Sequence, residues 1–107
     1  MTAGFAWKWE TKNNKDAFDI VIEGIPKRWN SSQKDWVNST NAVNEVGCIH
    51  TVQGYDLNYG FVILGPDIYY DSDKDAVCVN RANFKDAVAK KKASDDDLQK
   101  IIVNAYY

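Results

Sequence analysis

Five residues between positions 50 and 56 carry groups that can bind a ligand. They are His50, Thr51, Gln53, Gly54 and Asp56. The His, Thr and Gln side chains can donate hydrogen bonds, and the Asp carboxylate can accept them. Gly lets a ligand approach the backbone closely because it has no Cβ. This set permits ligand binding, although the residue types alone do not identify the ligand.

Two short apolar runs, at positions 46–49 and 61–64, flank this polar segment. Both runs are rich in β-branched or aromatic residues and are bounded by Gly, which is typical of strands buried on both faces of a sheet. In open parallel sheets, ligands gather at the carboxyl ends of the strands. We therefore expect the polar segment to form a ligand-binding turn between two inner strands.

Apolar patterns elsewhere in the chain predict an α/β fold with a mainly parallel central sheet. A strand at 18–22 would join strands at 46–50 and 61–64 in that sheet. Two further apolar segments, 68–71 and 76–79, flank four polar residues and predict an added β-hairpin.

Two helices are predicted near the C-terminus. The first spans 83–92 and ends in three lysines, whose charge complements the helix dipole. Ser94 would cap the second helix, because acidic residues follow it through the first turn. Leu98 and Ile102 then recur at helical spacing.

Aromatic residues in the first thirty positions leave two interpretations open. Residues 5–10 alternate and predict a strand with Phe5, Trp7 and Trp9 on one face. Such a face is most often core, and the alternative is a platform for stacking nucleobases. Similarly, residues 27–29, Lys-Arg-Trp, form either a surface loop anchored by its Trp or a contact for a phosphate and a base.

Composition excludes several classes of protein. The 107 residues suit a single domain or part of one, and a net charge of −2 predicts at most weak nucleic-acid binding by this chain alone. No apolar run approaches the roughly 18 residues that a membrane span needs. Cys48 and Cys78 lie far apart and there is one His, so we expect no metal site, free thiols and a cytoplasmic location.

The segment 50–56, His-Thr-Val-Gln-Gly-Tyr-Asp, resembles motif V of superfamily 1 helicase-type ATPases, members of the P-loop NTPase superfamily. The outline of that motif is His, two small or apolar residues, Lys or Gln, Gly, any residue and an acid. A wider stretch, most of 4–68 including Gly-Phe-Ala-Trp-Lys-Trp at 4–9, is similar to the bacterial Schlafen-group-3-like DNA/RNA helicase domain. Asp56 stands where Glu is commoner in the motif.

The resemblance implies a role for each residue of the motif. Gln53, Gly54 and Asp56 would face a bound nucleotide, with the Asp carboxylate accepting a hydrogen bond from a ribose hydroxyl. His50 and Thr51 would lie toward the nucleic acid and donate hydrogen bonds to phosphate oxygens. No residue of the chain would be catalytic.

The same resemblance implies that residues 1–107 form a single domain, which is an incomplete copy of the second RecA-like motor domain of these enzymes. In that family ATP and Mg²⁺ bind between this domain and a P-loop domain of the same chain, and DNA or RNA runs across both. A P-loop sequence is not found in these 107 residues, and neither is motif VI. We therefore expect the chain alone to bind no cofactor and to be inactive as an ATPase, with an unpaired sheet edge inviting self-association.

Two other classes of function stay open on the residues alone. The chain could be a non-catalytic binding or protein-interaction module that shares the outline of motif V. A cysteine-dependent enzyme that uses Cys48 and His50 is the third, although it lacks a third group that would orient the pair.

Overall fold

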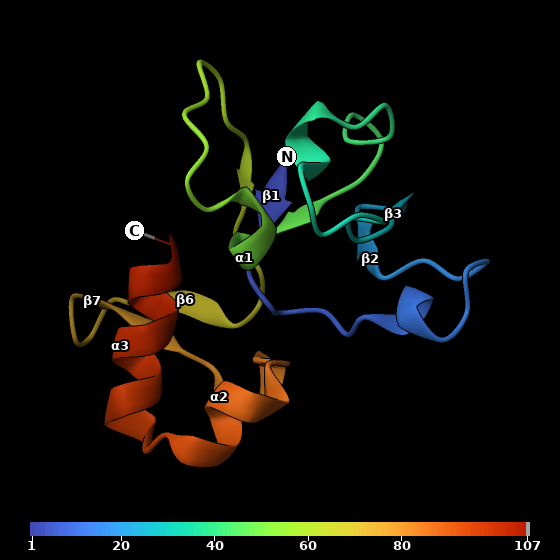
Figure 1. Cartoon of the computed structure of the whole chain (residues 1–107). Coiled ribbons are helices and arrows are strands. Elements are labelled where there is room, and N and C mark those ends of the chain that lie inside the picture. The colour runs from blue at the N-terminus through green and yellow to red at the C-terminus, as the bar shows by residue number, and fades with distance from the viewer. Residues whose placement is uncertain (107) are drawn as a thin grey trace. The chain divides into compact units, whose positions relative to one another are not determined.

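The structure, a computed structural model, describes residues 1–106 and divides into two compact units (Figure 1). Unit 1 consists of Met1–Ala3 and Lys8–Ile63, and unit 2 of Gly4–Trp7 and the chain from Leu64 onward. Both helices and strands occur, so the prediction of a mixed α/β fold is confirmed. None of the helices within the described residues is long and apolar enough to span a membrane.

A three-stranded parallel sheet forms the centre of unit 1. Its order is β4 (Gly47–Cys48), β1 (Thr2–Ala3) and β5 (Val62–Ile63). In the register, Thr2 pairs with both Gly47 and Val62. The sequence prediction of two parallel strands around the motif is confirmed, but they are the outer strands, because β1 lies between them.

Burial differs between the two outer strands. Val46, Gly47 and Cys48 are buried, as predicted, whereas Phe61 and Val62 are exposed. The prediction that residues 61–64 are buried on both faces is therefore wrong. Each outer strand pairs within the sheet only with β1, so pairing does not explain the difference. Trp36 lies against Gly47 and covers β4, whereas Phe61 and Val62 are 73% and 59% exposed.

The predicted strand at 18–22 exists as β2 (Ile20–Ile22), but it does not join the parallel sheet. It pairs in an antiparallel hairpin with β3 (Ile25–Lys27). The tight connection through Glu23 and Gly24, both with positive φ, returns the chain at once and so favours antiparallel pairing. The placement of 18–22 in the parallel sheet was wrong.

Two tryptophans fill the interior of unit 1. The Trp29 side chain is 1% exposed, and its backbone forms a parallel bridge with Val46. This Trp therefore anchors the loop that contains it. Trp36, in the 3-10 turn η2 (Trp36–Asn38), lies against Gly47 so closely that a Cβ on Gly47 would collide with the indole ring. A glycine is therefore required where β4 crosses this ring.

Residues 5–10 do not form the predicted strand. The 3-10 turn η1 (Glu10–Lys12) follows an irregular segment, and Phe5 and Trp7 belong to unit 2 whereas Trp9 belongs to unit 1. The aromatic residues are thus divided between the two units, and their alternation in the sequence does not reflect a shared strand face.

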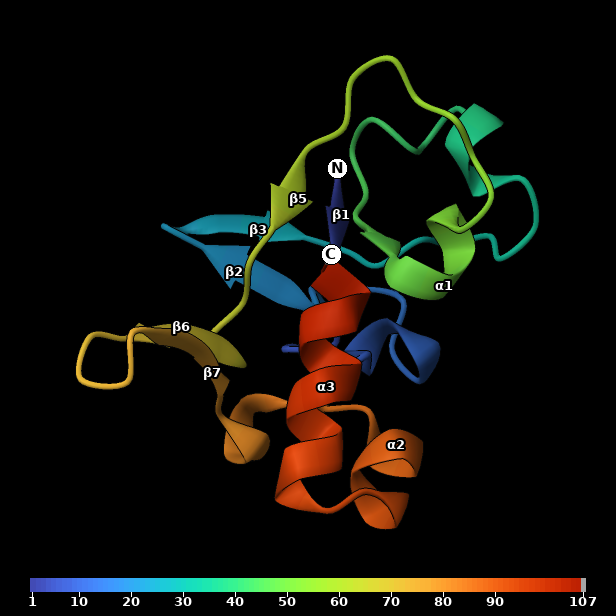
Figure 2. The ribbon, with the colours of Figure 1, turned by 90° about the vertical axis from the view of Figure 1, so that its left-hand side faces the viewer.

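Unit 2 contains the predicted hairpin and both predicted helices. Strands β6 (Ile68–Asp71) and β7 (Ala76–Val79) are antiparallel, and the 3-10 turn η3 (Arg81–Asn83) follows them. Helix α2 (Ala87–Lys92) begins four residues later than predicted, and α3 (Asp95–Tyr106) packs against β7 (Figure 2). Asp86 caps α2 by accepting hydrogen bonds from Val88 N and Ala89 N, which explains the later start.

The core of unit 2 forms around α3. Leu98 and Ile102 are fully buried together with Phe84, and Phe5, Ile68 and Val79 pack against them. Ser94 Oγ accepts a hydrogen bond from Asp97 N and donates one to the Asp97 carboxylate, so the predicted cap is confirmed. Its effect is to fix where the helix begins.

A buried polar pair stands beside this core. The Tyr106 hydroxyl donates a hydrogen bond to Asp67 Oδ1 over 3.0 Å, while Asp67 Oδ2 is buried without a hydrogen-bond partner among the described residues. Burial raises the pKa of Asp67 above its ordinary value, although the hydrogen bond from Tyr106 acts in the opposite direction. Burial also raises the pKa of Tyr106.

Candidate functional site

The predicted motif occupies a short helix and an exposed loop in unit 1. Helix α1 (Ile49–Val52) starts directly after β4, and residues 53–61 lead from it to β5. The helix contacts both β1 and η2. The polar segment therefore emerges from the carboxyl end of a parallel strand, as the sequence analysis predicted.

His50 and Thr51 lie on α1 rather than at a strand end. His50 is exposed, and Thr51 is half-buried with its Oγ1 atom 3.0 Å from Cys48 Sγ. When the thiol is the donor in that contact, the Thr51 hydroxyl keeps its own proton for another acceptor.

Gln53, Gly54 and Asp56 follow in the loop, and all three are exposed. Gly54 has a φ of +82°, a left-handed conformation in which other residues are strained. A Cβ built on Gly54 meets no atom within 4 Å, so the backbone is open to a ligand at this point. Asp56 is two residues further along the chain, with its carboxylate at the surface.

Tyr55 ties the loop to the body of unit 1. Its hydroxyl donates a hydrogen bond of 2.8 Å to Asp35 Oδ1, and Tyr55 N donates to Val52 O over 3.4 Å. The bond to the Asp35 carboxylate raises the pKa of Tyr55. Because Tyr55 is held in this way, Gly54 and Asp56 on either side of it have a defined position.

Sequence analysis missed a residue that orients the start of this segment. Asn30 is buried, its Oδ1 accepts a hydrogen bond from Cys48 N over 3.0 Å, and its Nδ2 donates to Ser32 O. It thereby connects the loop after Trp29 to the residue that precedes α1. The only sequence signal was an amide residue among several in a segment rich in Asn and Ser.

The alternative of a cysteine-dependent site loses its geometric basis. Cys48 is buried in β4, whereas His50 is exposed and lies in α1, so the two residues do not lie on one strand. Within residues 1–106, moreover, no group of three or more His, Cys, Asp or Glu side chains could hold a metal ion.

Comparison with known proteins relates the chain to one family and to a yeast protein. The family model of the Schlafen group 3 DNA/RNA helicase domain matches residues 1–107. An uncharacterized protein of Saccharomyces cerevisiae is 39% identical over 102 residues, a match that covers 87% of this chain but only 22% of that protein. No solved structure matches the chain significantly.

Proposed function

Because the chain belongs to the Schlafen group 3 DNA/RNA helicase domain family, we propose that it is part of the second RecA-like domain of an ATP-dependent helicase or translocase. The observation that carries the proposal is the exposed loop 53–56, which follows a short helix at the end of a parallel strand and places an open left-handed Gly54 near a surface carboxylate. The parallel sheet and the position of the segment suit one wall of a cleft completed by another domain.

Gly54, Asp56 and Gln53 would bind the nucleotide. The open backbone at Gly54 fits the close approach of a ligand, because no neighbouring atom fills the space above it. The Asp56 carboxylate would accept a hydrogen bond from a ribose hydroxyl, as acidic residues do in dinucleotide sites. The Gln53 amide would bridge these residues to the nucleic-acid side. ATP with Mg²⁺ supplies the phosphoryl chemistry in such enzymes.

His50 and Thr51 would bind the nucleic acid. Donors on a short helix can hydrogen-bond to phosphate oxygens, which positions a strand without selecting its sequence. These two residues immediately precede the nucleotide-binding loop. A conformational change at the nucleotide site would therefore shift the nucleic-acid contacts when the domains close. The partners are therefore DNA or RNA and the P-loop domain of the parent protein.

The test is an Asp56→Ala substitution in the full-length parent protein. Loss of a charge-assisted hydrogen bond costs about 1.5–3 kcal/mol, so kcat/KM for ATP should fall roughly 10- to 100-fold in the presence of nucleic acid. Steady-state ATPase assays with a single-stranded oligonucleotide measure this effect.

Asp73→Ala is the matched control. Asp73 is also exposed, but it lies in the hairpin loop of unit 2, outside the motif. This variant should keep the wild-type ATPase activity, and both variants should melt within a few degrees of the wild type. Unchanged ATPase activity in Asp56→Ala would instead favour a non-catalytic binding module.

A further inference from the structure

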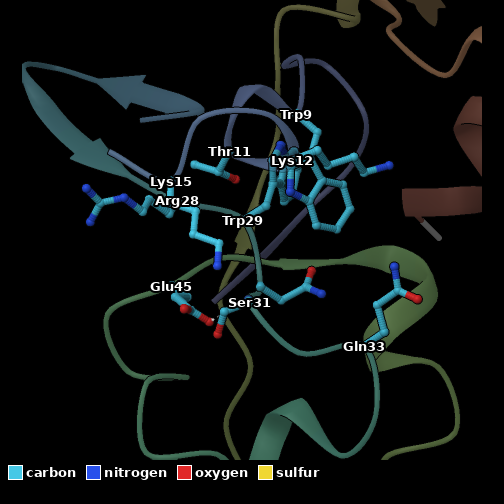
Figure 3. A pocket seen from close by; sticks show the side chains of 10 residues that line it. Trp9, Thr11, Lys12, Lys15, Arg28, Trp29, Ser31, Gln33 and Glu45 are labelled. Carbon is cyan, nitrogen blue, oxygen red and sulfur yellow. Dashed lines mark hydrogen bonds between the residues drawn. The ribbon is translucent and has the colours of Figure 1, made fainter. Parts of the chain in front are cut away.

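A hollow lies in unit 1, and none of residues 50–56 lines it. It encloses about 440 Å³, which is within the roughly 300–1,000 Å³ typical of small-ligand sites. Its walls come from η1 and the following turn and from the loop after β3 (Figure 3). Of the residues that line it, Asn30 also bonds to Cys48 N at the start of the motif segment.

Positive charge gathers around this hollow although the chain as a whole is negative. Lys12, Lys15 and Arg28 line it together with one acid, Glu45. One oxygen of Glu45 already accepts hydrogen bonds from Ser31 N and from the Trp36 indole. Neither lysine pairs with a carboxylate in the described part of the chain. The pocket therefore offers two ammonium groups to an anion.

Arg28 is already held in place at the rim. Its guanidinium donates hydrogen bonds to Ala17 O and Asp16 O and stacks over Phe18 at 4.2 Å. Figure 3 shows this guanidinium turned away from the two lysines and the indole rings, so Arg28 supports the rim of the pocket.

Two indole rings form an aromatic wall. Trp9 and Trp29 lie 5.8 Å apart between ring centroids, and the Lys12 ammonium sits 4.6 Å from the centre of the Trp9 ring (Figure 3). Trp29 is buried and forms the floor, whereas Trp9 is partly exposed. A planar ligand can thus reach Trp9 once the flexible Lys12 chain moves toward an anion.

The walls of the pocket are fixed by a buried carboxylate. Asp19 accepts hydrogen bonds from Thr11 N and Thr11 Oγ1, each at 2.8 Å, and from Trp29 N at 2.9 Å. Because one side chain holds both the turn that carries Lys12 and the loop that carries Trp29, the backbone at these positions keeps its spacing. The hollow is therefore built by the fold and is not a gap between mobile loops.

We propose that this pocket binds one nucleotide unit of a single-stranded nucleic acid. Its phosphate would contact Lys12 and Lys15, and its base would stack on Trp9. Cations beside an accessible aromatic ring match the two parts of a nucleotide, since phosphates bind Lys and Arg and every base has a face that stacks. The site does not depend on the ATP-binding role proposed for residues 53–56.

Fluorescence anisotropy with labelled (dT)12 and (U)12 at low salt tests the proposal on the 107-residue chain. The Lys12→Gln/Lys15→Gln variant should bind at least 10-fold more weakly than the wild type. Each neutralised phosphate contributes about 0.7 to the slope of log affinity against log salt for single strands, so losing the contacts to one phosphate should make the slope shallower by roughly 0.7.

A second pair of lysines provides the control. Lys92 and Lys100 are exposed in unit 2, and Lys92→Gln/Lys100→Gln changes the net charge equally. Its affinity and salt slope should stay close to those of the wild type. Equal losses of affinity in the two double variants would mean that only the net charge matters, and this would overturn the proposal. Failure of the wild type to bind either oligonucleotide would overturn it as well.

Trp9 variants test the stacking contact. Trp9→Ala should weaken binding roughly 5- to 100-fold, the usual effect of losing a base–aromatic stack. Trp9→Phe keeps an aromatic face and should retain most of the affinity, so it distinguishes lost stacking from a disturbed fold. Binding of free ATP to the pocket without binding of either oligonucleotide would assign the site to a free nucleotide and overturn the strand proposal.

Discussion

One acidic residue from each unit illustrates two opposite environments for a carboxylate. In unit 1 Asp56 stands on an exposed loop next to an open glycine, whereas in unit 2 Asp67 is fully buried against Tyr106. An exposed carboxylate can contact a ligand. A buried carboxylate contacts the protein interior, and its desolvation costs free energy. The difference teaches that exposure, rather than residue type, separates the candidate site from a structural polar pair.

The largest effect should come from the core of unit 2. Leu98→Ala removes a fully buried side chain and should lower the free energy of unfolding by about 2–5 kcal/mol. Ile101→Ala, on the same helix but 43% exposed, is the matched control and should cost less than about 1 kcal/mol. Urea denaturation followed by circular dichroism measures both. Similar losses would mean that α3 does not pack as described.

The buried carboxyl of Asp67 should make stability depend on pH. Its pKa is raised in the folded state, so the native chain holds a proton that the unfolded chain releases above pH 3.8, the ordinary value. The stabilisation is complete below that pH and is lost as the pH rises through the folded-state pKa. In Asp67→Asn this fall should disappear, as measured by urea denaturation from pH 3.5 to 7.

Tyr106→Phe sharpens the same test. The hydrogen bond from Tyr106 lowers the pKa of Asp67, so its removal should extend the fall in stability to higher pH. Parallel pH profiles for the wild type, Asp67→Asn and Tyr106→Phe would show that Asp67 does not titrate differently in the folded chain.

A smaller effect is expected in the exposed loop of unit 1. Gly54→Ala should cost about 1–2 kcal/mol, because a left-handed conformation strains any residue with a Cβ. Gly60→Ala, in the same loop, also meets no atom within 4 Å but lacks a positive φ, so it should be neutral. Thermal melts compare the two. Equal melting temperatures would show that the loop does not hold the conformation that leaves Gly54 open.

Local features of the sequence were enough to predict much of unit 2. The hairpin at 68–79 and the start of α3 depend on nearby residues, because a turn and a cap are satisfied within a few positions. The motif segment was also placed correctly at the end of a parallel strand, since the apolar run before it and the polar residues after it are adjacent.

The tertiary structure decided what depends on contacts far apart in the chain. The central strand Thr2–Ala3 has two residues and therefore no recognisable period, and only its pairing with β4 and β5 defines it. The pocket beside Trp9 likewise depends on Asp19 bonding to Thr11 and Trp29, which are separated from it by eight and ten residues. By itself the sequence determined the local turns, the caps and the polar motif. Tertiary packing determined which strand is central and which carboxylates are buried, because pairing and desolvation depend on the whole fold.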